Sequence, residues 1–146
     1  MKKLLTVLLV LLCLAGCAKE SVPEDEFHLH FDIGVEDVHL VVFSFEVEDG
    51  MMSVIESGYV DGSAITGDYT MIFNGEDFPE GHSPEGFRFH IAFGNDVTDS
   101  IMDDKEPEKS VSSEEIGPFD PEWGQAYYYK VTGSYEEGIT VERIEK

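Results

Sequence analysis

The chain has 146 residues and a formal net charge of −22, from 31 acidic and 9 basic side chains. This length is enough for one domain with a hydrophobic core. Because nucleic-acid binding depends on basic side chains that neutralise phosphates, the charge excludes a nucleic-acid-binding protein.

Residues 1–16 have the layout of a secretory signal. Lys2 and Lys3 precede an apolar run, 4–14. As a helix this run rises only about 16 Å, roughly half of a bilayer core, so it is too short to cross a membrane. Small residues follow it. The segment therefore predicts an exported protein.

The sequence Leu14-Ala15-Gly16-Cys17 resembles the lipobox of bacterial lipoproteins. The resemblance implies cleavage between Gly16 and Cys17, a diacylglyceryl group on the Cys17 sulfur, and an amine acylated by a fatty acid such as palmitate. It also implies a domain outside the cytoplasm, anchored to the cell membrane or the outer membrane. Cys13, the other cysteine, would leave with the signal. A disulfide between the two would close a loop of three intervening residues and constrain nothing else.

The mature chain divides into a tether and a domain. Cys17 and the polar segment that follows it, to residue 26, predict a flexible tether. From residue 27 the apolar side chains recur with a period of two, as in half-buried strands. Asp49-Gly50 predicts a type I′ hairpin turn. The predicted strands are 27–33, 38–48, 51–59, 68–74, 87–93, 126–135 and 139–144.

The predicted fold of residues 27–146 is all-β. Strands with one apolar face must pack that face against another sheet, which favours an antiparallel β-sandwich. About seven strands in a chain of this length resemble an immunoglobulin-like sandwich, although a small β-barrel is the alternative. Phe43, Phe45, Phe89 and Ile91 are placed on the core face.

Residues 95–125 predict a long acidic loop, and loops of this length are usually functional or disordered. Within it, 110–116 favours at most one or two helical turns. Charge repulsion predicts a mobile front half, 95–112. Ile116, Phe119 and Trp123 predict a back half that packs on the sandwich.

Two patterns suggest metal sites. His28 and His30 share a strand face, and together with His90 from another strand they could bind zinc or copper. The alternative is that they face solvent without a ligand. Ten carboxylates between Asp96 and Glu122 offer oxygen ligands for calcium, with an ion-free loop as the alternative. The favoured expectation is a protein without a cofactor.

Aromatic residues gather near the end of the predicted loop. Phe119, Trp123 and Tyr128, with Tyr127 beside them, would form a stacking platform for a sugar or a peptide if they were exposed together. The alternative is that they close the open end of the sandwich.

No arrangement typical of an enzyme appears: there is no nucleophile elbow, phosphate-binding glycine loop or thiol nucleophile. We therefore expect a non-catalytic binding or interaction module, anchored to a membrane by its lipid, with an unidentified protein or small-molecule ligand. The alternatives are a metal-binding envelope protein that uses the histidines or the acidic loop, and a solute-binding accessory of a transporter.

Overall fold

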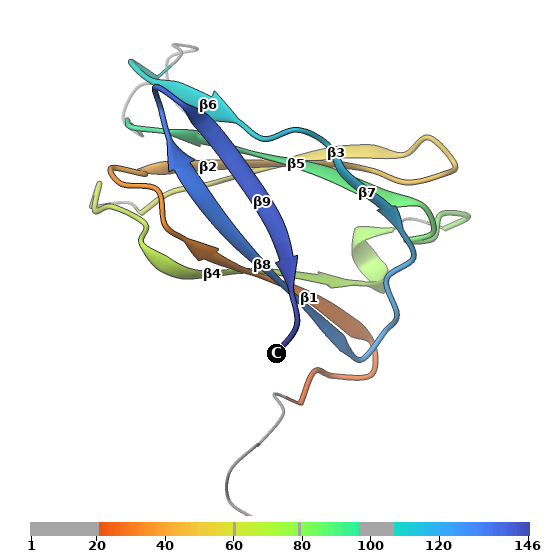
Figure 1. Cartoon of the computed structure of the whole chain (residues 1–146). Coiled ribbons are helices and arrows are strands. Elements are labelled where there is room, and N and C mark those ends of the chain that lie inside the picture. Colours follow the sequence, from red (N-terminus) through yellow and green to blue (C-terminus); the bar gives the residue numbers. More distant parts are fainter. Residues whose placement is uncertain (1–20, 60, 79, 97–106) are drawn as a thin grey trace, which may run out of the picture.

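The computed structural model describes residues 21–59, 61–78, 80–96 and 107–146, which form two β-sheets packed face to face (Figure 1). The first sheet has the order β4-β1-β8-β9 and the second β3-β2-β5-β6, with β7 also paired to β5. The bounds are β1 Glu26–Ile33, β2 Leu40–Glu46, β3 Met52–Ser57, β4 Gly67–Asn74, β5 Phe87–Gly94, β6 Ser110–Ser112, β7 Ile116–Phe119, β8 Gln125–Ser134 and β9 Gly138–Ile144. A 3₁₀ turn, Gly75–Asp77, precedes β5. The predicted all-β sandwich is confirmed.

Alternating apolar side chains build the core between the sheets, because successive residues of a strand point to opposite faces. All seven predicted strands are present, and Phe43, Phe45, Phe89 and Ile91 face the core as predicted. Aromatic rings meet across the interface: the ring centre of Phe45 on β2 lies 5.3 Å from that of Phe73 on β4, and that of Phe89 on β5 lies 5.3 Å from that of Tyr129 on β8. The core is therefore continuous from one end of the sandwich to the other.

The turn between β2 and β3 differs from the prediction. Gly50 has a φ of 85°, and its N–H donates to the carbonyl of Val47 at 3.0 Å. A type I′ turn also needs a positive φ at Asp49, but Asp37 is the only non-glycine residue with a positive φ in the described part of the chain. The type I′ prediction is therefore wrong.

Two short strands, β6 and β7, form within the segment predicted as a loop. The expectation of a helical turn at 110–116 is wrong, because this stretch instead supplies backbone partners to β5. Ser113 supports the pairing: its hydroxyl accepts a hydrogen bond from the N–H of Ile91 at 3.1 Å and donates to the carbonyl of Glu114. The predicted mobile front half falls mainly on 97–106, which lies outside the described residues.

The topology gives the sandwich two different ends. β8 pairs parallel with β1, so both strands begin at the same end as residues 21–25. We call this the tether end; β9 also finishes toward it (Figure 1). At the opposite end, the loop end, lie the connections from β1 to β2, from β3 to β4 and from β8 to β9, together with the end of β5 and the start of β6.

Candidate functional site

The structure does not bring the three predicted metal-binding histidines together. His28 and His30 lie on the outer face of β1 in the first sheet, whereas His90 lies on the outer face of β5 in the second. The two sheets stand between them. In the described ranges, no group of three or more His, Cys, Asp or Glu side chains has an arrangement that could hold a metal ion.

Each of these histidines contacts neighbours on its own sheet. Nε2 of His28 lies 2.8 Å from a carboxylate oxygen of Glu26, and the His28 side chain is buried despite its outward strand position. The ring of His30 stacks on Tyr128 with centroids 4.9 Å apart, and its Nδ1 lies 2.9 Å from the hydroxyl of Thr70.

The acidic segment is only partly described. Asp99, Asp103, Asp104 and Glu106, four of the carboxylates offered for calcium, lie outside the described residues. Of those described, Asp120 accepts a hydrogen bond from the N–H of Gly86 at 2.8 Å. This carboxylate anchors the connection that follows β7 to the start of β5.

The aromatic residues predicted to form a stacking platform lie in three different places. Trp123 remains 39% exposed, and its ring packs against Phe27 and Phe78 at 5.5 and 6.1 Å. Phe119 packs on the edge of the core against Phe87 at 5.7 Å. Tyr128 lies on the outer face of β8. These three side chains do not make one continuous surface.

Two cations cover two of these aromatic groups. The guanidinium carbon of Arg143, on β9, lies 4.9 Å from the ring centre of Tyr127 and 5.8 Å from that of Phe119. The ammonium of Lys146 lies 4.8 Å from the ring centre of Tyr128. At these distances the ring faces attract the cations electrostatically.

A hollow of about 480 Å³ opens beside these groups at the end of the β8–β9 pair. We call it the aromatic–cation hollow. It is lined by Ala126, Tyr127, Tyr128, Arg143, Ile144, Glu145 and Lys146. The strand register explains the composition: Tyr128 is opposite Ile144, and Tyr129 is opposite Arg143, so the tyrosine rings of β8 meet Arg143 of β9 and Lys146 after it. The volume lies within the range of small-ligand sites.

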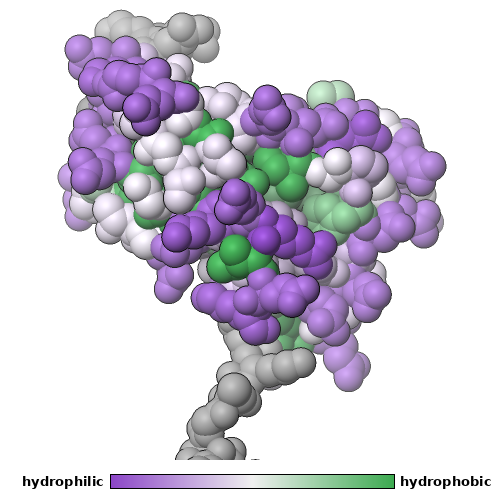
Figure 2. Space-filling model, in the orientation of Figure 1, coloured by the Kyte–Doolittle hydropathy of each residue, from purple (hydrophilic) through white to green (hydrophobic). Residues whose placement is uncertain are grey.

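Two cationic side chains lie together at the hollow. Neither Arg143 nor Lys146 forms an ion pair with any carboxylate in the described part of the chain, although acids outnumber bases 31 to 9. Lys109, by comparison, lies 3.3 Å from Glu136. Figure 2 shows how hydrophilic one face of the domain is, with small separate apolar patches.

The sequence reasoning missed Arg143 and Lys146. A signal was present: three of the nine bases, Lys130, Arg143 and Lys146, fall in the last 22 residues, next to a run of three tyrosines. What the sequence does not show is which of these bases would face the tyrosines, because that depends on the register between β8 and β9.

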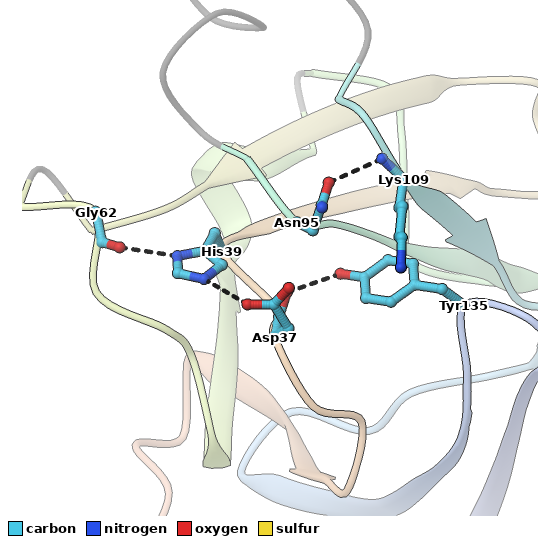
Figure 3. A network of polar contacts seen from close by, with 6 residues as sticks. All are labelled: Asp37, His39, Gly62, Asn95, Lys109 and Tyr135. Atoms are coloured by element: carbon cyan, nitrogen blue, oxygen red, sulfur yellow. Dashed lines mark hydrogen bonds and ion pairs between the residues drawn. The ribbon is translucent and has the colours of Figure 1, made fainter.

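The loop end carries a polar network that ties connections together (Figure 3). Nδ1 of His39 lies 2.8 Å from the carbonyl oxygen of Gly62, and its Nε2 lies 3.1 Å from a carboxylate oxygen of Asp37. The hydroxyl of Tyr135 donates to the backbone carbonyl of Asp37 at 3.1 Å. Burial raises the pKa of Tyr135 to about 12. These contacts join segments before β2, before β4 and after β8.

The same network reaches the segment between β5 and β6. The backbone N–H of Lys109 donates to the side-chain oxygen of Asn95 at 2.8 Å (Figure 3). These groups are engaged with one another, so they connect the described segments of the loop end. The aromatic–cation hollow, with its two cations unpaired by carboxylates, is the better candidate for a ligand site.

No family model, curated protein or solved structure matches this chain. The fold class established by the structure is an all-β sandwich. No helix in the described ranges is long and apolar enough to cross a membrane.

Proposed function

We propose that the chain is a membrane-anchored lipoprotein whose β-sandwich is a non-catalytic binding module, with the aromatic–cation hollow as its ligand site. The hollow is the observation that carries the proposal. It combines aromatic faces with polar groups not engaged by carboxylates, which is the composition of small-ligand sites.

The anchoring part of the proposal rests on the sequence. A basic start, a short apolar run and the lipobox-like Leu14-Ala15-Gly16-Cys17 occur in the order found in bacterial lipoproteins. Acyl chains contribute about 0.8 kcal/mol per buried methylene, so two or three of them would hold a strongly acidic domain at an anionic membrane.

The non-catalytic part rests on the chemistry of the lining. Glu145 has the one side-chain carboxylate that lines the hollow, so the side chains described there do not include the pair of Asp or Glu residues that acid–base hydrolysis of sugars uses. The other lining side chains bind by stacking, charge and apolar contact.

Substitution of the lipidated cysteine tests the anchor. We expect Cys17→Ser to release the protein from the membrane fraction or to leave the signal uncleaved, whereas Cys13→Ser, a matched control, should change neither property. Fractionation and electrophoretic migration measure both. A Cys17→Ser protein that behaves like the unchanged chain would refute the anchor.

A ligand panel tests the binding module. Neutral and acidic mono- and oligosaccharides are added to the full chain in a zwitterionic detergent, and the amide resonances of residues 126–128 and 143–146 are followed by NMR. We expect at least one class to shift these resonances and to be recovered chemically unchanged. A ligand that is converted to a product would refute the non-catalytic assignment, and a panel without effect on these resonances would refute the site.

A further inference from the structure

We infer that the aromatic–cation hollow selects an anionic ligand, one that presents a carboxylate or phosphate group on a carbon-rich ring or short chain. This inference rests on the proposed function, because it names the chemistry of the ligand that the hollow would bind.

The charge of the lining favours an anionic ligand. Among the side chains that line the hollow, the two cations of Arg143 and Lys146 face one carboxylate, that of Glu145, within a chain of net charge −22. The hollow is therefore a place where an anion meets attraction instead of the general repulsion of the domain.

The arrangement of Arg143 favours a carboxylate or phosphate group on this ligand. Its guanidinium carbon lies over the ring of Tyr127 and near that of Phe119. The N–H donors of a guanidinium lie in its plane, and a cation–π contact does not use them as hydrogen-bond donors. They make no hydrogen bond to a described residue. A planar fork of donors matches carboxylate and phosphate oxygens, to which it binds in a bidentate manner.

The apolar part of the lining favours a ligand that also has a carbon ring or chain. Ala126, Ile144 and the tyrosine rings offer carbon surface beside the cations. A small inorganic ion would leave this surface unused, whereas a ligand with a carbon ring or chain would cover it. Two sources supply such chemistry: a soluble acidic sugar, and the headgroup of an anionic lipid, since the hollow lies toward the tether end.

Matched probes test the inference on the full chain in a zwitterionic detergent. Glucuronate and glucose differ at one carbon, which carries a carboxylate in glucuronate only. We expect glucuronate to shift the resonances of residues 126–128 and 143–146. Glucose should bind at least about tenfold more weakly, because it lacks the charged group that accepts the hydrogen bonds. Vesicles of phosphatidylcholine with and without phosphatidylglycerol, carrying the lipidated chain, test the headgroup source by the same resonances.

Variants assign the effect to the cations. Arg143→Met keeps a long apolar side chain over the rings but removes the charge, and we expect it to weaken glucuronate binding about tenfold. Lys146→Met, at an exposed position after β9, should weaken it in the same direction. Lys130→Met removes the same charge from β8 without touching the lining and should leave binding within about twofold, the size of an exposed-charge effect.

Equal binding of glucose and glucuronate, or Arg143→Met binding like the unchanged chain while its melting temperature is retained, would overturn the anionic inference and leave the binding module standing. Shifts with phosphatidylglycerol vesicles alone would support the inference with a lipid source, and shifts with glucuronate alone would support it with a soluble one. If neither of these anions nor any member of the sugar panel shifts the hollow resonances, both the inference and the proposed site fail.

Discussion

Replacing Phe89 by alanine tests the packing of the core at its centre. The side chain is fully buried, and its ring lies 5.1 Å from Phe43, 5.3 Å from Tyr129 and 5.8 Å from Phe31. Removing a buried phenylalanine costs about 3–5 kcal/mol through lost transfer free energy and the cavity that remains. Because three aromatic partners from both sheets surround the ring and each aromatic pair adds about 0.5–1.5 kcal/mol, we expect the upper part of this range.

Equilibrium unfolding in urea, followed by the fluorescence of Trp123, measures the change. Trp123 is the only tryptophan, and it packs against Phe27, so its emission reports on the folded sandwich. His90→Ala is the matched control on the other face of the same strand. Its imidazole makes only a 3.5 Å contact to a carbonyl and a 3.8 Å contact to Glu115, so we expect a change below about 1 kcal/mol. A loss below about 1 kcal/mol for Phe89→Ala, or a larger loss for His90→Ala, would refute this packing.

Three further changes probe other parts of the domain. Gly133→Ala should lower the free energy of unfolding by several kcal/mol, because Gly133 has a φ of 121° and a Cβ there would collide with the carbonyl oxygen of Gly138. Gly138→Ala, the control, has a positive φ but open space and should cost only about 1 kcal/mol. Thermal melts measure both changes. Ser113→Ala should cost about 1–3 kcal/mol in urea unfolding, because the N–H of Ile91 loses its acceptor; an unchanged midpoint would contradict this. Burial raises the pKa of Tyr129 to about 12, so above pH 10 the unfolded chain loses that proton first. The contribution of Tyr129 to the free energy of unfolding therefore falls by about 1.4 kcal/mol per pH unit until about pH 12. Tyr135, whose pKa is also raised, adds to the alkaline slope, so Tyr129→Phe should make this slope shallower without removing it, and an unchanged slope would count against the burial.

The strands and their inward faces follow from the sequence because their alternation is strong. In Phe87–Gly94 every second side chain is apolar, and a one-residue shift would expose all of them at once, so the phase is fixed by burial alone. The same holds for β1 and β2. Where the pattern is short or polar, prediction fails: β6 contains two serines and one valine, and it is a strand only because the edge of β5 needs partners.

The candidate site depends on facts that local sequence does not contain. The pairing of β8 with β9 decides that Arg143 lies opposite Tyr129 and Ile144 opposite Tyr128, and the shape of the hollow follows from that register. The separation of His28 and His90 likewise follows from sheet assignment, since both residues obey the predicted outward phase of their strands. The alternation of apolar and polar residues predicts which face of a strand is buried, but not which other strand pairs with it.

Because β1 pairs in parallel with β8, the first strand of the domain gains this partner only after most of the chain has been synthesised. Nearly the whole domain is synthesised between Phe27 and its partner Gln125, so the loop that this pairing closes is among the longest the chain offers. Pairings of such long sequence separation are slow to form and leave strand edges open to other chains in the meantime. A chain that stopped before β8 would keep the β1–β4 pair but would present the other edge of β1, with its row of unpaired backbone groups, as a template for aggregation.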